Sequence, residues 1–161
     1  FFFKQTTAYE ISACLVGSEM CIRDRGIPLF KPPFSRITAI DMNTGEHAWV
    51  IPTGETPARV QEVIDENNLD IPNTGTGALV PMVVTPSMLV YSDTSTDGTP
   101  MLYAVDKNTG ETLGSIEVPD RSRYGMSSWT HDGHQYIMLQ TGPKLTAVAL
   151  PAAKPAETGY H

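Results

Sequence analysis

AIDMNTGEHAW at residues 39–49 and AVDKNTGETLG at residues 104–114 are two copies of one pattern, and this repeat decides the fold. The copies start 65 residues apart, and six of their eleven positions are identical. A fainter copy of the leading strand follows as LTAVA at 145–149, without the Asp and the turn. A short repeated unit is typical of architectures in which each unit packs against its neighbours.

Each full copy predicts a β-hairpin. Residues 36–41 and 101–106 are short, mostly apolar runs, as expected of strands buried between packed sheets. Each run ends in Asp-x-Asn-Thr-Gly, in which the Asp carboxylate accepts hydrogen bonds from the turn and Gly supplies a positive φ. Second strands are predicted over 46–51 and 111–118. The Asp and the Gly therefore have structural roles.

Turn signals predict more hairpins in the second half of the chain. The strands are expected at 88–91, 127–130, 135–140 and 144–150, joined by turns at 93–98, 131–133 and 141–143. Together with the repeat, this gives three strands from 88 to 118 and three more from 127 to 150. Short antiparallel strands at this spacing predict an all-β fold, a partial β-propeller whose blades are typically four-stranded.

One segment is different and predicts a short inserted helix. Thr56 is expected to be its N-cap, with Pro57 at the first helical position. Val60, Val63 and Ile64 then form one apolar face. We interpret the helix as a surface excursion between blades rather than a functional element.

Composition excludes several classes of partner. The 161 residues carry a net charge of −7, which disfavours binding to nucleic acid or to an anionic membrane surface. No apolar stretch approaches the roughly 20 residues that a membrane-spanning helix needs.

The two ends of the chain are predicted to lie outside the fold. Residues 1–25 resemble a translated sequencing adapter and are treated as non-native, so a disulfide or metal site at Cys14 and Cys21 is rejected. Residues 26–150 are expected to form the C-terminal propeller blades, and the Ala- and Pro-rich residues 151–161 a disordered tail. Because the chain begins without Met, we expect it to be a fragment.

At AIDMNTGEHAW the sequence resembles the tryptophan-docking motif of pyrroloquinoline quinone (PQQ)-dependent dehydrogenases. Three longer segments resemble the C-terminal region of membrane-associated quinoprotein glucose dehydrogenases and their soluble relatives: LFKPPFSRITAIDMNTGEHAWVIPTGETP at 29–57, GTPMLYAVDKNTGETLGSIEVP at 98–119 and HDGHQYIMLQTG at 131–142. The resemblance implies the last two to three blades of an eight-bladed ring, with Trp49 packed between neighbouring blades.

The sequence departs from the family pattern at two places. Gly114 stands where the second copy should have its Trp, which predicts a weaker contact there or another residue filling the gap. After Gln140, Thr141-Gly142-Pro143 turns straight into the last strand, where relatives have a longer loop. Any ligand contact from that loop is therefore in doubt.

The resemblance implies catalysis with PQQ, Ca²⁺ and a general base. No position here matches a family catalytic base or metal ligand, and no PQQ contact is assigned. Solvated positions are predicted for the acidic residues Asp93, Asp97, Asp132, Glu62, Asp65 and Glu66. His131 and His134 are expected to flank a surface turn, with His47 in a strand and His161 at the terminus. The segment 74–77 has glycines but precedes a strand-like run, so it is no phosphate loop, although it is expected near the ring axis.

The parent protein implied by the resemblance is a periplasmic PQQ-dependent dehydrogenase that oxidises a sugar or alcohol. Its electrons would pass to a quinone or cytochrome of the respiratory chain, and a membrane anchor could lie in a missing N-terminal part. The fragment alone is expected to be inactive. Two alternatives stay open: a non-enzymatic propeller scaffold of the outer-membrane assembly type, and an independent small β-sandwich.

Overall fold

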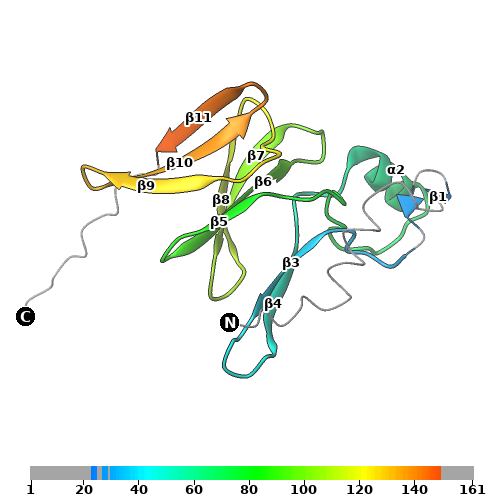
Figure 1. The fold of residues 1–161 in the computed structure, drawn as a ribbon. Helices are drawn as coiled ribbons and strands as arrows, with labels where there is room; N and C mark the ends of the chain where they lie inside the picture. The colour runs from blue at the N-terminus through cyan, green and yellow to red at the C-terminus, as the bar shows by residue number, and fades with distance from the viewer. Residues whose placement is uncertain (1–22, 25–26, 29, 150–161) are drawn as a thin grey trace, which may run out of the picture.

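The structure is a computed structural model that describes residues 23–24, 27–28 and 30–149 (Figure 1). The predictions for the tail 151–161, and for most of 1–25, lie outside the described residues. The elements are β1 (Arg23–Asp24), β2 (Ile27–Pro28), β3 (Arg36–Ile40), β4 (His47–Pro52), α2 (Ala58–Glu66), β5 (Met82–Val84), β6 (Met88–Thr94), β7 (Pro100–Asp106), β8 (Thr112–Glu117), β9 (Ser127–His131), β10 (His134–Thr141) and β11 (Lys144–Ala149). Within the described residues, no helix is long and apolar enough to cross a membrane.

The strands form consecutive antiparallel sheets (Figure 1). A four-stranded sheet in the order β5-β6-β7-β8 follows the hairpin β3-β4 and precedes the three-stranded sheet β11-β10-β9, while β1 and β2 form a small separate pair. Each large sheet is a meander in which neighbours in sequence are neighbours in space. The arrangement confirms the prediction of an all-β partial propeller with one short helix.

The central sheet is buried on both faces because apolar residues occupy both alternating sets of positions in β6 and β7. One face packs against the β3-β4 hairpin and forms a core of Ile37, Leu89, Tyr91, Tyr103 and Val105. The opposite face packs against the β9-β10-β11 sheet and forms a second core of Val90, Leu102, Val118, Ile137 and Leu139. Side chains of a strand alternate between its two faces, so neighbouring residues of β6 enter different cores. This is how a propeller blade packs between two neighbours.

The two turns of the repeat have nearly the same hydrogen bonds. The Asp41 carboxylate accepts from the Asn43 N–H at 2.8 Å, and the Asp106 carboxylate accepts from the Asn108 N–H at 2.7 Å. In both copies the glycine N–H donates to the carbonyl of the same Asp, at 2.7 and 2.9 Å. The Gly residues have φ values of 76° and 79°. The predicted structural roles of Asp and Gly are therefore confirmed in both hairpins.

Trp49 joins the first copy of the repeat to the second. Its indole Nε1–H donates to the carbonyl of Lys107 at 3.0 Å, across 58 residues of sequence. A Cβ at Gly110 would lie 2.9 Å from Cδ2 of the indole, so the ring lies directly on this turn. A buried aromatic ring with its polar N–H bonded contributes both packing and orientation. The prediction that Trp49 packs between neighbouring blades is confirmed.

The second copy has no such contact at Gly114. A Cβ built at this position meets nothing within 4 Å, and every residue of β8 is exposed. The aliphatic core between the central sheet and the β9-β10-β11 sheet holds these two sheets together instead.

Two local predictions were wrong. The N-cap of α2 is Pro57 and not Thr56, because the Thr56 hydroxyl is engaged with the connector that follows the helix. Strand β6 extends to Thr94, so Asp93 lies in a strand and not in a turn. The predicted three strands from 88 to 118 are confirmed as β6, β7 and β8, and β5, which is only three residues long, adds a fourth strand to their sheet.

The meander places the long connectors at one end of the sheets. The turns β5–β6 and β7–β8 lie at one end, while the β6–β7 turn, the entry to β5 and the exit from β8 lie at the other. The second end, here called the connector end, therefore receives residues 53–81, which include α2, and residues 118–126. Loops gathered at one end of a rigid scaffold are where ligand sites concentrate.

Replacing Gly110 with Ala tests the contact with Trp49. A positive φ alone costs about 1–2 kcal/mol for a residue with a Cβ. The control is Gly45→Ala, because nothing lies within 4 Å of a Cβ there. Its free energy of unfolding should fall by this amount only. Gly110→Ala should lose about 1–3 kcal/mol more because its Cβ forces the indole to move. The measurement is urea unfolding of both variants and the wild type. Equal losses in the two variants would show that the indole does not depend on this turn.

Candidate functional site

Seven polar side chains joined by hydrogen bonds gather at the connector end, and four of them are buried. These side chains come from the segment before β3, from the connector 53–81 and from the end of β6. They are Ser35, Thr53, Thr56, Asn73, Thr74, Thr76 and Asp93, here called the connector cluster. Thr53, Thr74 and Asp93 are at most 1% exposed.

Hydroxyl groups of the connector cluster hold the connector backbone in place. Thr53 Oγ1 donates to Ser35 Oγ at 2.7 Å, and Ser35 Oγ accepts from the Gly77 N–H at 2.9 Å. Thr56 Oγ1 accepts from the Thr74 N–H at 3.0 Å. The connector has no sheet partner for these N–H groups, and a buried backbone group must be paired somewhere. Side chains therefore supply the acceptors that a β-ladder would otherwise provide.

Asp93 is the buried carboxyl group of the cluster and is 0% exposed. Its Oδ2 accepts from Thr76 Oγ1 at 2.8 Å and its Oδ1 accepts from the Thr94 N–H at 2.9 Å. Arg121 Nη1 lies 3.6 Å from Oδ1, which is an ion pair without a hydrogen bond. Desolvation outweighs these interactions and raises the pKa of Asp93 above its ordinary value.

Glu55 attaches the start of the connector to the β6–β7 turn. Its carboxylate accepts from both the N–H and the hydroxyl of Thr96, each at 2.9 Å. Next to it, the Gly54 N–H donates to the Tyr91 hydroxyl at 3.3 Å, and burial raises the pKa of this tyrosine. The connector that carries α2 is thus fixed to the central sheet before the helix begins.

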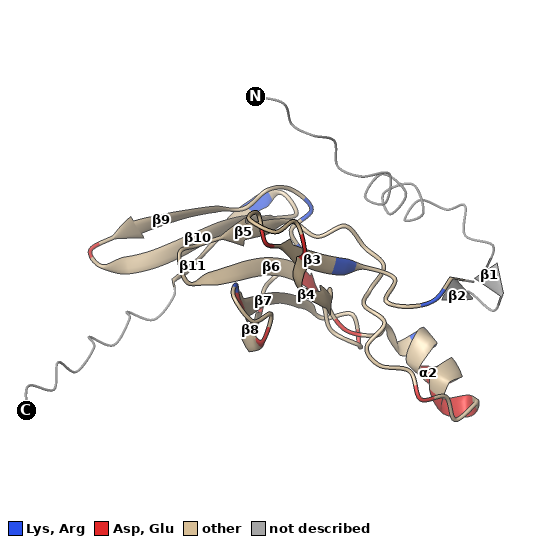
Figure 2. Cartoon of the chain, turned by 90° about the horizontal axis from the view of Figure 1, so that it is seen from below, with Lys and Arg blue, Asp and Glu red and all other residues tan. Residues whose placement is uncertain are grey.

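The structure places the other acidic candidates at the surface, in two separate turns and on α2. Asp97 and Asp132 are exposed in turns, and Glu62, Asp65 and Glu66 are exposed on α2, where Figure 2 shows acidic residues (red) at the end of the helix. Asp93 is the exception, and its predicted solvated position was wrong. No sequence signal distinguished it from Asp97, because its burial depends on the connector packing over the end of β6.

The histidines form no common site within the described part of the chain. His131 and His134 are exposed partners in the β9–β10 hairpin, and His131 Nε2 lies 3.4 Å from Asp132 Oδ2. His47 is exposed on β4, and His161 lies outside the described residues.

The segment 74–77 is followed by β5 and opens no helix. Its glycines serve close packing, because a Cβ at Gly75 would lie 2.8 Å from the carbonyl oxygen of Ser35.

The acidic side chains of the described residues do not fit a calcium ion. Calcium takes six to eight oxygen ligands, and residues 30–149 bring no group of three His, Cys, Asp or Glu side chains together. Both carboxylate oxygens of Asp93 already accept hydrogen bonds from within the fold. No catalytic step is therefore derived through calcium, and no described residue is assigned to PQQ.

Comparison with known proteins gives the family. A family model described as "Glucose/ethanol/alcohol dehydrogenase, beta-propeller domain", of the PQQ type, matches residues 4–137. The chain belongs to this family. The PQQ propeller domain agrees with the stacked sheets and with the Trp49 contact described above.

Two relatives have similar sequences over most of the chain. The glycerol dehydrogenase large subunits of Gluconobacter thailandicus and Gluconobacter oxydans (strain 621H) are each 28% identical over 121 residues. The match covers 73% of this chain and 15% of each relative, so the chain spans a small part of their length. No solved structure matches. The division of the chain at residues 25 and 150 stays a prediction.

The buried carboxyl group predicts a pH-dependent stability. Because the pKa of Asp93 is raised above 3.8 in the folded chain, protonation stabilises the fold, and that contribution is lost as pH rises through the raised pKa. The stability of the wild type relative to Asp93→Asn should therefore fall as pH increases from about 4 to 7. Urea unfolding of both proteins at a series of pH values measures this difference in the free energy of unfolding.

The matched control is Asp97→Asn, for which the change of stability with pH should have the opposite sign. Hydrogen bonds from Ser95 and Thr99 lower the pKa of exposed Asp97 to about 2. The stability that ionised Asp97 contributes to the fold is present above pH 3.8 and is lost as the pH falls through about 2. A constant difference between wild type and Asp93→Asn across the series would contradict the assignment of Asp93.

Proposed function

We propose that this chain supplies neighbouring blades to the propeller of a PQQ-dependent dehydrogenase that oxidises a sugar or alcohol. The observation that carries the proposal is the Trp49 contact, in which one repeat docks on the turn of the next. Such docking gives each sheet a fixed place relative to its neighbour, which a ring around a central cofactor requires. Membership of the quinoprotein propeller family supports the same function.

The proposed substrate class is a small polyol, sugar or alcohol. The two Gluconobacter relatives are named for glycerol, and the family description names glucose, ethanol and alcohol. In the parent enzyme, bound PQQ and Ca²⁺ would supply the oxidising chemistry, and a quinone or cytochrome of the respiratory chain would be the electron acceptor. The resemblance to quinoprotein glucose dehydrogenases favours the periplasm as the location.

The proposed role of this chain within the enzyme is structural support of the connector end. The connector cluster and the Glu55 contact hold residues 53–81 against the central sheet, and a rigid support is what a bound cofactor needs.

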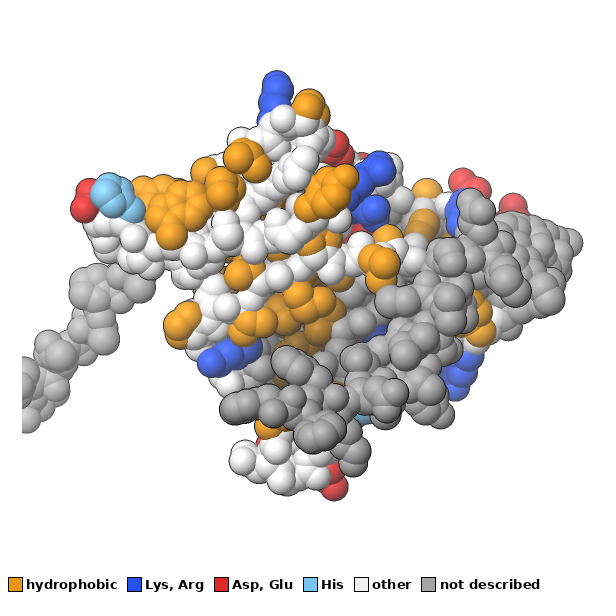
Figure 3. All heavy atoms as spheres, in the orientation of Figure 1, with side chains coloured by type: hydrophobic (Ala, Val, Ile, Leu, Met, Phe, Trp, Pro, Cys, Tyr) orange, Lys and Arg blue, Asp and Glu red, His pale blue; other side chains and the backbone are white. Residues whose placement is uncertain are grey.

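The β9-β10-β11 sheet also has an apolar outer surface. Trp129, which stacks on Tyr136, is 40% exposed and Leu145 is 70% exposed, and Figure 3 shows hydrophobic side chains (orange) over this hairpin. A further sheet covering this surface would complete the packing.

The first test is activity of the chain alone. We expect no dye reduction with glycerol, glucose or ethanol in the presence of PQQ and Ca²⁺, because residues 30–149 bring together no group of three His, Cys, Asp or Glu side chains that could hold Ca²⁺. Measurable PQQ-dependent reduction by the purified chain would contradict this part of the proposal.

The second test is a chimera. Residues 30–149 replace the matched segment of the Gluconobacter oxydans glycerol dehydrogenase large subunit, and PQQ-dependent dye reduction with glycerol is measured. We expect activity that disappears when the segment is deleted. A chimera that is folded by circular dichroism and retains PQQ, but oxidises no polyol, sugar or alcohol, would overturn the proposal and favour a scaffold role.

A further inference from the structure

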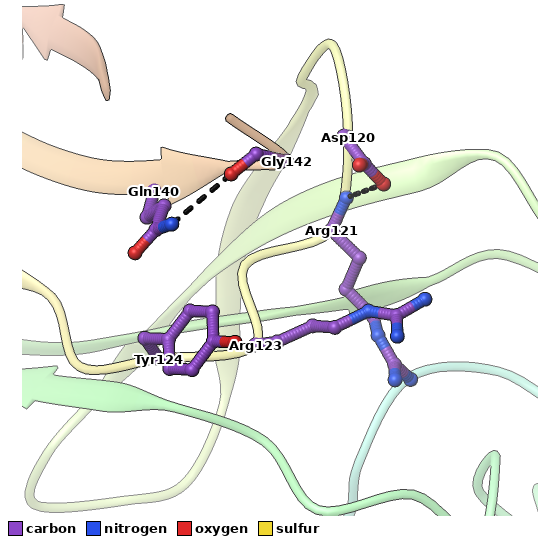
Figure 4. Close-up of a pocket in the computed structure, with 6 residues that line it drawn as sticks. All are labelled: Asp120, Arg121, Arg123, Tyr124, Gln140 and Gly142. Atoms are coloured by element: carbon purple, nitrogen blue, oxygen red, sulfur yellow. Dashed lines mark hydrogen bonds between the residues drawn. The ribbon is translucent and has the colours of Figure 1, made fainter. Parts of the chain in front are cut away.

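A pocket of about 330 Å³ lies between the connector 118–126 and the β10–β11 turn. It is lined by Asp120, Arg121, Arg123, Tyr124, Gln140 and Gly142 (Figure 4). Pockets of this size are at the small end of those that enclose small molecules. The function proposed above does not use this pocket.

The two arginines of the pocket are held on the same side of an anchored residue. Ser122 is 0% exposed and forms a β-bridge with Thr141. Its N–H donates to Ser92 Oγ at 3.1 Å, and its own hydroxyl donates to the Tyr124 carbonyl at 3.1 Å. Residues on either side of an extended residue point to the same face, and Figure 4 shows both guanidinium groups side by side. The arrangement is therefore fixed by the backbone.

The charges around the two arginines leave Arg123 without an ion-pair partner among the described residues. Arg121 reaches the buried Asp93 at 3.6 Å, and among the described residues no carboxylate lies within ion-pair distance of Arg123. Asp120 is engaged by the Arg121 backbone N–H at 2.7 Å. The two adjacent guanidinium groups repel each other at short range, and an anion held between them would offset this repulsion. Figure 2 shows this basic segment (blue) on the loop that leads into β9.

We propose that this pocket binds a small anion through a carboxylate or phosphate group held by Arg121 and Arg123. The planar guanidinium fork matches both groups, because its N–H donors pair with two oxygens at once. The Gln140 amide N–H donates to the Gly142 carbonyl at 3.1 Å, so its side chain is fixed at the rim. Tyr124 is 63% exposed and supplies a flat apolar wall for the remainder of the ligand.

The experiment titrates the full chain with inorganic phosphate and, separately, with succinate, at low ionic strength. Calorimetry measures the affinity for the wild type and for Arg123→Gln, with Arg59→Gln on the exposed face of α2 as the matched control. We expect saturable binding that weakens about tenfold or more in Arg123→Gln, since a charge-assisted contact is lost, and is unchanged in Arg59→Gln. Succinamide, the neutral analogue of succinate, should not bind.

The two arms distinguish the source of the anionic group. Binding of phosphate alone identifies a phosphate ligand, and binding of succinate alone identifies a carboxylate ligand. Equal weakening in Arg123→Gln and Arg59→Gln, or no saturable binding of either anion, overturns the proposal.

A second measurement does not depend on affinity. Arg121→Gln is avoided because it leaves Asp93 buried without its cation. Instead, phenylglyoxal labelling of the wild type is followed by mass spectrometry. The anion that binds should slow the labelling of Arg123 and leave that of Arg59 unchanged. Parallel protection of both arginines would contradict a site at this pocket.

Discussion

The contact of Trp49 with the turn that contains Gly110 is the interaction on which the order of the sheets depends. It joins the end of one repeat to the turn of the next, and it is directional because the indole N–H must meet the Lys107 carbonyl. The hairpin β3-β4 would otherwise be two short strands with little to fix them. Once the indole is in place, Ile37 and Ile51 lie against the same face of the central sheet and extend the core.

The connector end shows a different kind of organisation. Apolar burial orders the sheets, whereas hydrogen bonds between small hydroxyl side chains order the connector. Thr53, Thr56 and Thr76 each pair with a group distant in sequence, at separations of 17 or 18 residues. Hydrogen bonds contribute modestly to net stability but are costly to leave unmade. The cluster therefore specifies one arrangement of the connector more than it stabilises the fold.

The sequence was sufficient for the features that depend on local chemistry. Both Asp-x-Asn-Thr-Gly turns, the β9–β10 hairpin at Asp132-Gly133 and the position of α2 follow from residue preferences that act over a few positions. The docking of Trp49 followed from the resemblance. Features that depend on distant packing were missed. The burial of Asp93 requires the connector that packs over it. The pairing of Arg121 with Asp93 joins two residues that are far apart in sequence and belong to no recognisable motif.

The absence of an indole at Gly114 gives the two contacts of the central sheet unequal tolerance of substitution. The contact with β3-β4 contains a ring in one orientation and a hydrogen bond to a backbone carbonyl, so few other side chains can replace Trp49. The core on the opposite face consists of Val, Leu and Ile, and packing of this kind accepts changes that conserve total volume. Substitutions that conserve volume can thus accumulate at one face of the central sheet, while the other face requires the indole of Trp49.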